Sequence, residues 1–122
     1  DMVMLKDNHN DYAGGITGGV KRTKEYLDFK GKDIKIEVET RDLKEVQEAL
    51  DTGLVDRIMF DNFSPEHMVD AVKLVNGKCE TEASGGITGD TIRSYAETGV
   101  DYISVGALTH SVKSLDLSLK EY

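Results

Sequence analysis

Polar residues recur in this sequence at the ends of short apolar stretches, where their side chains could act together in one site. The residues in question are Lys6, Glu39, Asp61, Glu82 and Ser84. A single carboxylate of this kind is more often solvated, ion-paired or part of a turn than catalytic, but five polar groups in matching positions favour a site. Carboxylate and phosphate oxygens suit hard cations, so this set is compatible with a divalent ion such as Mg²⁺.

Two glycine turns provide a second chemical signal. Ser84-Gly85-Gly86 stands directly before an expected helix, and Gly106 is followed four residues later by His110. Paired glycines let backbone N–H groups approach an anion closely, and the N-terminus of a helix favours phosphate. Two such turns after successive late strands predict a phosphate cradle, and therefore a phosphorylated ligand, with His110 close enough to contact it.

The other histidines and the single cysteine give weaker signals. His9 could line the mouth of a site or cap a turn, and the sequence leaves both roles open. His67 falls in the first turn of an expected helix and is interpreted as a surface residue. Cys79 alternates with apolar positions, which favours a small core residue over a nucleophile. No His and Cys residues have the spacing of zinc ligands.

The hydrophobic periodicity switches repeatedly between about two and about 3.6 residues, which predicts strands alternating with helices. Strands are expected over residues 2–6, 33–39, 57–61, 78–83 and 100–105. Helices are expected after the glycine-rich turn 14–19, between Asp42 and Gly53, between Ser64 and Gly77, over 88–98, and near 115–119. This alternation predicts βα units with parallel strand pairing.

Alternate residues of a strand point to opposite faces, so an apolar face against the helices leaves the other face for chemistry. The residues expected on that inner face are Met2, Met4, Lys6, Lys35, Glu37, Glu39, Arg57, Met59, Asp61, Lys78, Glu80, Glu82, Ser84, Tyr102, Ser104 and Gly106. Active sites of (β/α) barrels lie at the carboxyl ends of the strands, where the five polar residues above should meet. The deeper charged residues are interpreted as a charge-paired interior lattice. These are Lys35, Glu37, Arg57, Lys78 and Glu80.

Five βα units do not close a barrel, which typically needs eight units and about 250 residues. We therefore expect residues 1–122 to form the C-terminal part of an incomplete TIM-like α/β barrel, with the first barrel strands lying N-terminal to Asp1. A small open α/β sheet with covered edges is the alternative.

Composition excludes several classes of function. The 15 Lys and Arg residues against 23 Asp and Glu give a net charge of −8, which argues against a nucleic-acid binder. No apolar run approaches the roughly 20 residues that a membrane span needs. A single cysteine forms no internal disulfide, which predicts a reducing, cytoplasmic setting.

Five segments occur in an order that resembles the C-terminal part of the quinolinate phosphoribosyltransferase family, also called nicotinate-nucleotide pyrophosphorylase (carboxylating). They are Met4-Leu-Lys-Asp-Asn-His9, Ile36-Glu-Val-Glu-Thr40, Phe60-Asp-Asn-Phe-Ser-Pro65, Glu82-Ala-Ser-Gly-Gly-Ile87 and the stretch from Ala96 to Ser111. The resemblance extends over the whole chain and marks residues 1–122 as a partial catalytic barrel domain. It implies an N-terminal α/β sandwich domain elsewhere in the protein and a homodimer or higher homo-oligomer.

The resemblance also implies roles for individual residues. Lys6 matches the lysine that helps to bind the quinolinate carboxylates. Glu39 and Asp61 match the acids that hold the ribose hydroxyls and the Mg²⁺ of phosphoribosyl pyrophosphate. The residues that match the loops around the 5′-phosphate are Ser84, Gly85, Gly86, Gly106 and His110. A basic substrate-binding segment and a His-Arg pair are expected before Asp1, and residues 10–12 depart from the family's small apolar residues.

The implied activity is that of a pentosyltransferase of NAD biosynthesis, which converts quinolinate and 5-phosphoribosyl 1-pyrophosphate to nicotinate mononucleotide, pyrophosphate and CO₂. The nearest alternative is the related molybdenum-transport-associated family, which acts on another acceptor. A generic phosphate-binding barrel isomerase or synthase would explain the glycine turns but not the set of Lys6, Glu39 and Asp61. A non-catalytic barrel fragment that completes a partner's sheet is the third class.

Overall fold

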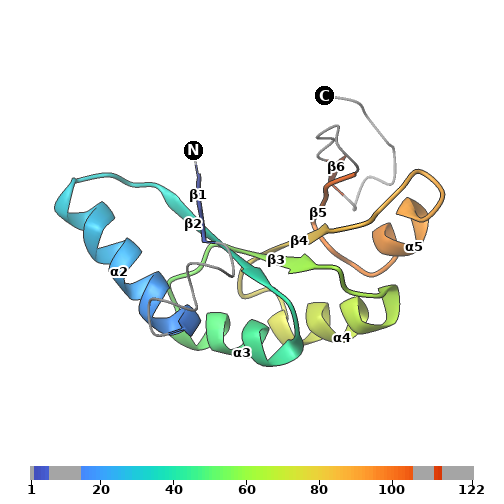
Figure 1. Ribbon diagram of the computed structural model, residues 1–122, viewed down its shortest axis with the longest axis horizontal. Coiled ribbons are helices and arrows are strands. Elements are labelled where there is room, and N and C mark those ends of the chain that lie inside the picture. Colours follow the sequence, from blue (N-terminus) through green and yellow to red (C-terminus); the bar gives the residue numbers. More distant parts are fainter. Residues whose placement is uncertain (1, 6–14, 106–111, 114–122) are drawn as a thin grey trace.

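The computed structural model describes residues 2–5, 15–105 and 112–113, which form one sheet with helices between its strands (Figure 1). The strands lie side by side in sequence order: β1 (Met2–Leu5), β2 (Lys35–Thr40), β3 (Arg57–Asp61), β4 (Glu80–Ser84), β5 (Tyr102–Ile103) and β6 (Val112–Lys113). The helices are α2 (Gly15–Phe29), α3 (Leu43–Thr52), α4 (Pro65–Val75) and α5 (Ile92–Ala96). The strands from β1 to β5 pair in parallel and β6 pairs antiparallel to β5. The expected alternation of strands and helices with parallel pairing is confirmed.

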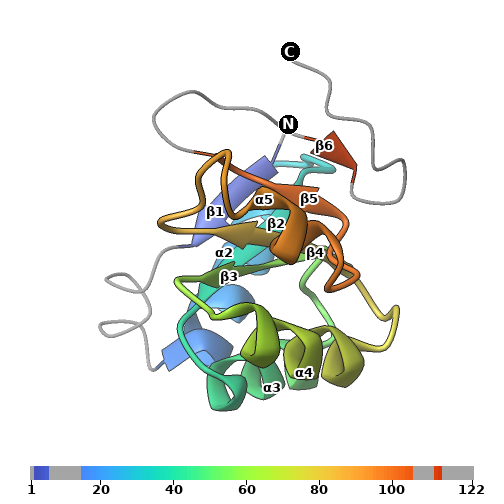
Figure 2. The ribbon, with the colours of Figure 1, turned by 90° about the vertical axis from the view of Figure 1, so that its right-hand side faces the viewer.

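Helices α2, α3 and α4 cover one face of the sheet, and Figure 2 shows α3 and α4 side by side beneath it. Apolar residues of the strands point toward these helices, so that Val38, Ile58 and Phe60 are completely buried. The sequence pattern of apolar residues on this face is therefore confirmed. No helix in the described part of the chain is long and apolar enough to span a membrane.

Two helices begin where their capping residues predict. The Asp42 side chain accepts a hydrogen bond from Glu45 N at 2.8 Å, and the Ser64 hydroxyl oxygen accepts one from His67 N at 3.2 Å. These bonds satisfy backbone donors that the first turn of a helix leaves without a partner. Helix α3 ends at Gly53 in the left-handed conformation, as expected, but the left-handed cap of α4 is Asn76, one residue before the expected Gly77.

The structure differs from the expected elements at several places. The region 15–19, expected as a glycine-rich turn, is the start of α2, because burial of Ile16 and Val20 against the sheet outweighs the poor helix propensity of glycine. Helix α5 covers only Ile92–Ala96 rather than 88–98, since Thr91 closes a separate turn by accepting from Thr88 N at 3.0 Å.

The ends of the sheet also differ from expectation. Lys78 lies before β4, and its N–H donates to Val75 O at the end of α4. Strand β5 has two paired residues rather than the expected six, and the antiparallel strand β6 was not predicted. Two-residue strands show no measurable periodicity, which explains why the pattern missed them. The helix expected near 115–119 lies outside the described residues.

Candidate active site

The carboxyl ends of β3 and β4 bring an acid and a glycine turn into contact. Asp61 and Ser84 are register partners, and Asn62 N donates to Ser84 O at 2.9 Å. A Cβ atom added to Gly85 would lie 2.8 Å from both Asp61 Oδ1 and Asn62 N, so the two strand ends pack without room for a side chain. Gly85 has a φ of +88°, a conformation that glycine adopts without the steric cost other residues pay.

Glu39 lies on the same face of the sheet as Asp61. The register pairs Glu39 with Met59, and Asp61 is two residues beyond Met59 on β3. Side chains two residues apart on a strand share a face, so the two acids lie on the same face of neighbouring strands, offset by two residues along them. This placement agrees with the expected convergence at the rim. Lys6, His9, Gly106 and His110 lie outside the described residues.

Glu82 lies level with Glu39, because both residues pair with Met59 in the register, but its side chain is only 8% exposed. It also pairs with Tyr102 and stands two residues before Ser84 on β4. Its carboxylate accepts from the Ser104 hydroxyl at 2.7 Å and from Arg57 Nη1 at 3.4 Å. The register thus agrees with the expected level of Glu82, while its hydrogen bonds join its carboxylate to the charged groups around Arg57.

The expected charge-paired interior is found in part. Arg57 donates to Glu80 at 3.1 Å and its guanidinium carbon lies 3.9 Å from the centroid of the Tyr102 ring. Lys35 and Lys78 do not belong to this interior, because both side chains are exposed. We call the set around Arg57 the inner cluster. Its members are Glu37, Arg57, Glu80, Glu82, Tyr102 and Ser104.

Three acids of the inner cluster surround the Arg57 guanidinium, but they differ in burial and in hydrogen-bond partners. The pKa values of Glu37 and Glu80 therefore shift in opposite directions. Burial raises the pKa of Glu37 to about 8, with further contributions from a hydrogen bond to Glu82 and from its negative charge, while Arg57 acts in the opposite direction. Glu37 is 4% exposed, and its Oε2 atom finds no N–H or O–H donor among the described residues. The raised pKa favours the protonated form of Glu37 near neutral pH, in which its carboxylic acid can donate a hydrogen bond to Glu82.

The pKa values of Glu80 and Arg57 shift in the directions that favour their charged forms. Burial raises the pKa of Glu80, but hydrogen bonds from Arg57 and Tyr102 outweigh burial and lower it overall. Burial likewise lowers the pKa of Arg57, but its hydrogen bond with Glu80 and the nearby acids raise it overall. The two groups therefore form a fully charged pair.

Cys79 is a half-buried residue packed against the core, which confirms its interpretation as a small core residue. Burial, together with the negative charge of Asp101, raises the pKa of its thiol to about 11. A thiol of this pKa is almost entirely protonated at neutral pH and makes a poor nucleophile.

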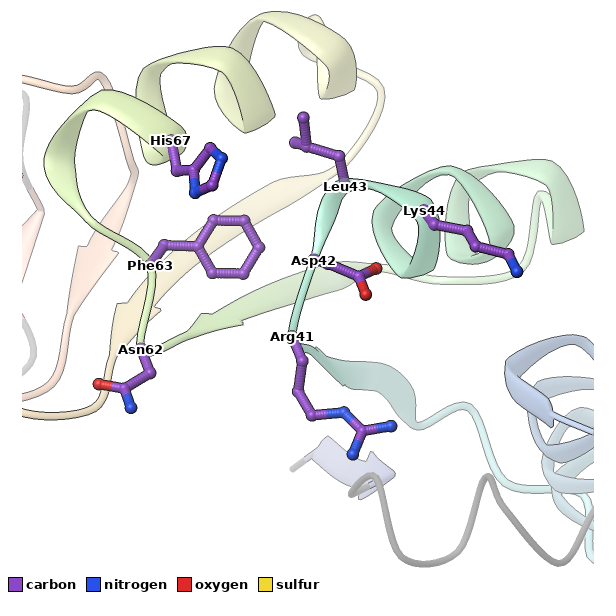
Figure 3. Close-up of a pocket in the computed structure, with 7 residues that line it drawn as sticks. All are labelled: Arg41, Asp42, Leu43, Lys44, Asn62, Phe63 and His67. Atoms are coloured by element: carbon purple, nitrogen blue, oxygen red, sulfur yellow. The ribbon is translucent and has the colours of Figure 1, made fainter.

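A pocket at the rim, on the helix side of the sheet, was missed by the sequence analysis. It has a volume of about 320 Å³ and lies between the turns that lead into α3 and α4 (Figure 3). It is lined by Arg41, Asp42, Leu43, Lys44, Asn62, Phe63 and His67. His67, interpreted as a surface residue, is exposed but also contacts the Phe63 ring, with 6.3 Å between the centroids. Asn62 has a φ of +63°, in the left-handed region where Asn is enriched among residues other than glycine. An Asn directly after the predicted strand was therefore a sequence signal for this turn.

The described residues contain no group of three or more His, Cys, Asp or Glu side chains that could hold a metal ion. Glu39 and Asp61 provide two carboxylates on one face. Mg²⁺ is commonly bound through one or two carboxylates, with substrate phosphates and water completing its octahedral shell. The chemistry of this donor pair therefore fits Mg²⁺ that is bound together with a phosphorylated substrate.

Parallel βα units with acids and a serine-glycine-glycine turn at the carboxyl ends of their strands define a domain of the α/β-barrel class. The family model described as "Quinolinate phosphoribosyl transferase, C-terminal domain" matches residues 1–120. The chain belongs to this quinolinate phosphoribosyltransferase family, as its sequence segments indicated.

Individual relatives agree with this assignment. The chain is 48% identical to the chloroplastic nicotinate-nucleotide pyrophosphorylase (carboxylating) of Arabidopsis thaliana, over 98% of this chain and 38% of the plant protein. It is 47% identical to the mitochondrial quinolinate phosphoribosyltransferase (decarboxylating) 2b of Nicotiana tabacum, with the same two coverages. The chain thus spans about two fifths of the length of these relatives.

Solved structures confirm the part-barrel fold. The nicotinate-nucleotide pyrophosphorylase of Francisella tularensis superimposes with a TM-score of 0.80 and 38% identity, over 93% of this chain and 39% of that one. A mandelate oxidase structure superimposes with a TM-score of 0.60 at 19% identity, which is a likeness of fold alone.

Proposed function

We propose that this chain supplies the phosphoribosyl-binding part of an enzyme that joins quinolinate to 5-phosphoribosyl 1-pyrophosphate in NAD biosynthesis. The products are nicotinate mononucleotide, pyrophosphate and CO₂. The observation that carries this proposal is the contact between Asp61 and the Gly85 turn at the rim, with Glu39 on the same face. Membership of the family supports quinolinate as the acceptor, rather than the acceptor of the molybdenum-transport-associated family.

The glycine turn after β4 is suited to the 5′-phosphate. Gly85 and Gly86 both have positive φ values, and the absence of Cβ atoms lets this bend pack closely against Asp61 and Asn62. Successive backbone N–H groups in such a bend form a concave surface that binds phosphate oxygens. We assign the 5′-phosphate to this turn, with Gly106 and His110 as the residues expected to complete the cradle.

Glu39 and Asp61 are assigned to the ribose. As pyrophosphate leaves C1, positive charge develops on the sugar ring, and carboxylates held nearby stabilise that charge. The same two side chains are the residues we propose to hold Mg²⁺, which when bound compensates the charge that develops on the leaving pyrophosphate. The carboxylates also accept hydrogen bonds from the ribose hydroxyls and so fix the position of C1.

The acceptor reacts through its own nitrogen. The pyridine nitrogen of quinolinate donates its electron pair to C1, and the C1–O bond to pyrophosphate breaks. The resulting pyridinium accepts the electron pair released when the adjacent carboxylate leaves as CO₂, and the ring carbon then takes up a proton. This sequence needs no covalent nucleophile on the protein. Lys6 is proposed to bind a quinolinate carboxylate.

The experiment uses protein expressed from the complete reading frame that contains these 122 codons. Quinolinate labelled in the departing carboxylate, phosphoribosyl pyrophosphate and Mg²⁺ are supplied, and release of labelled CO₂ is measured. We expect Asp61→Asn and Glu39→Gln each to lower kcat/KM by about a hundredfold, the usual effect of removing one electrostatic stabiliser. Asp70→Asn, on the exposed side of α4, is the matched control and should leave the rate unchanged.

Unchanged rates in both rim variants would refute the assigned roles. Assays in which other nitrogen bases replace quinolinate test the identity of the acceptor. Turnover with another base but not with quinolinate would reject quinolinate as the substrate and would leave the phosphoribosyl site as proposed. Chelation of Mg²⁺ should abolish turnover, and addition of Mg²⁺ should restore it.

Two further properties are proposed with this function. We expect a homodimer or higher homo-oligomer, to be measured by analytical ultracentrifugation of the same protein. A cytoplasmic location is proposed from the single cysteine, although related plant proteins are named as chloroplastic or mitochondrial. Microscopy of a fluorescent fusion in the source cell would test the location.

A further inference from the structure

Strand β5 is held to β4 by few backbone hydrogen bonds. Only Tyr102 and Ile103 belong to the strand. Two more backbone bonds flank it, from Asp101 N to Thr81 O at 3.1 Å and from Ser104 N to Ala83 O at 2.9 Å. A strand this short has little backbone pairing to fix its carboxyl end, so its side chains must contribute.

One side chain of β4 supplies that contribution at the rim end. Glu82 is 8% exposed, and its Oε2 atom accepts from the Ser104 hydroxyl at 2.7 Å. Its Oε1 atom faces Arg57 Nη1 at 3.4 Å. A short hydrogen bond to a charged, buried acceptor is stronger than one between neutral groups, because little water competes for either partner.

The deeper end of β5 is held by a second acid of the same strand. The Tyr102 hydroxyl donates to Glu80 at 3.1 Å, and the Arg57 guanidinium lies over the Tyr102 ring. Arg57 also pairs with Glu80 and Glu82, so one cation joins the two acids of β4. The inner cluster therefore attaches Tyr102 of β5, and Ser104 just after the strand, to β4, and of the two contacts the one to Glu82 lies nearer the rim.

We propose that Glu82 is a positioning residue, which acts through Ser104 to hold the carboxyl end of β5 beside the Ser84-Gly85-Gly86 turn. A phosphate bound between two turns requires a fixed distance between them, and displacements of about 1 Å are costly in preorganised sites. Glu82 sets that distance through Ser104 rather than by touching the substrate, because both of its carboxylate oxygens already accept hydrogen bonds from protein donors. The kinetic consequence rests on the proposed function, but the structural consequence does not.

Four variants test this inference in the protein made from the complete reading frame. Glu82→Gln keeps the size of the side chain and removes its charge, whereas Ser104→Ala removes the hydroxyl donor. Both changes are then combined in one double variant. Glu80→Gln is the matched control, because it neutralises the other acid of β4 that pairs with Arg57, keeps a side-chain oxygen to accept from the Tyr102 hydroxyl, and leaves the Ser104 bond in place.

The first measurement is hydrogen exchange at the Ser104 amide, with the Ile58 amide of β3 as a reference for global opening. We expect Glu82→Gln and Ser104→Ala each to speed exchange at Ser104 by about tenfold relative to Ile58, the effect of losing one hydrogen bond to a charged group. The double variant should show no more than the larger single effect, because both changes act on the same hydrogen bond, one by removing the charge of its acceptor and the other by removing its donor. Glu80→Gln should leave the ratio of the exchange rates at Ser104 and Ile58 near its wild-type value.

The second measurement is steady-state kinetics. We expect Glu82→Gln and Ser104→Ala to raise KM for phosphoribosyl pyrophosphate by about tenfold with a smaller change in kcat, since binding geometry rather than the chemical groups is altered. Ser104→Thr keeps the hydroxyl and should retain the wild-type KM. A purely structural role would instead lower the melting temperature without this separation of KM from kcat.

The inference is overturned if the two single effects on exchange add in the double variant, or if Glu80→Gln matches Glu82→Gln in both measurements. Should the wild-type protein release no CO₂ from quinolinate, the proposed function fails, and exchange at Ser104 decides the positioning role without the kinetic measurement.

Discussion

At the residue scale, the inner cluster shows how one side-chain type takes different protonation states within a few ångströms. Glu37 and Glu80 both face Arg57, yet the pKa of Glu37 is raised and that of Glu80 is lowered. The difference arises because Glu37 is buried beside another acid, whereas Glu80 accepts from both Arg57 and Tyr102. A carboxyl group loses its charge where burial is not compensated by donors.

Glu37 predicts that the protein loses stability as pH rises from acidic to mildly alkaline values. Its pKa rises from 4.5 to about 8 on folding, so between these values the folded state holds a proton that the unfolded state has released. The free energy of unfolding therefore falls as pH rises from about 4.5 to about 8. Glu37→Gln removes this titration, so its free energy of unfolding should decline less between pH 5 and pH 9. Urea unfolding without metal at pH 5, 7 and 9 measures the difference.

Glu80→Gln is the control for this experiment. The pKa of Glu80 is lowered on folding, so its contribution to stability is lost toward acid pH rather than alkaline pH. Glu80→Gln should keep the wild-type decline between pH 7 and pH 9. An equal decline in wild type and Glu37→Gln would show that Glu37 is ionised in the folded protein.

At the element scale, the turns after the strands decide which polar groups meet. The turn after β4 brings Gly85 against Asp61 and Asn62, whereas the turn after α3 leaves Gly53 with open space around it. Both glycines have positive φ values. In the sequence, Gly53 and Gly85 both simply follow a predicted helix or strand. Only the packed structure shows that Gly85 lies close to β3, whereas Gly53 only caps α3.

These two glycines provide a matched pair of substitutions. Gly53→Ala introduces only backbone strain and should cost about 1 kcal/mol of unfolding free energy. Gly85→Ala adds a Cβ atom 2.8 Å from a backbone nitrogen, so it should cost clearly more than Gly53→Ala and should also weaken binding at the rim. Urea unfolding measures the first effect, and titration with ribose 5-phosphate measures the second. Equal stability losses would mean that the β3 and β4 ends separate without penalty.

The reliability of the sequence predictions also varied by element. Asp42 and Ser64 marked the starts of α3 and α4 because a capping side chain is a local interaction. The short elements α5, β5 and β6 were mispredicted in length or missed, since their lengths depend on contacts between distant segments. The start of α2 was displaced for the same reason: packing against the sheet decides it.

At the scale of the whole molecule, the two faces of the sheet serve different purposes. The helix side holds the apolar core, in which Phe60 is completely buried and contacts Phe63 at 5.2 Å between ring centroids. The opposite side holds the inner cluster and leads to the rim. Stability and chemistry are thus separated by the alternation of side chains along each strand.

This separation predicts unequal effects of two phenylalanine substitutions. Phe60→Ala should lower the free energy of unfolding by about 3–5 kcal/mol, because it leaves a cavity in the core. Phe29→Ala removes a ring that is 85% exposed at the end of α2 and should change stability by less than about 0.5 kcal/mol. Urea unfolding of both variants gives the comparison. A large loss from Phe29→Ala would indicate that this ring is covered by another part of the protein.

The sequence by itself determined the alternation of strands and helices, the division of each strand into apolar and polar faces, and the family of the chain. These properties follow from local spacing, which the order of residues contains directly. Only the tertiary structure decided that the Glu82 carboxylate binds Ser104 and Arg57, that burial raises the pKa of Glu37 and that Gly85 packs against Asp61. Each of these depends on strand register and burial, which arise from contacts between residues far apart in the sequence.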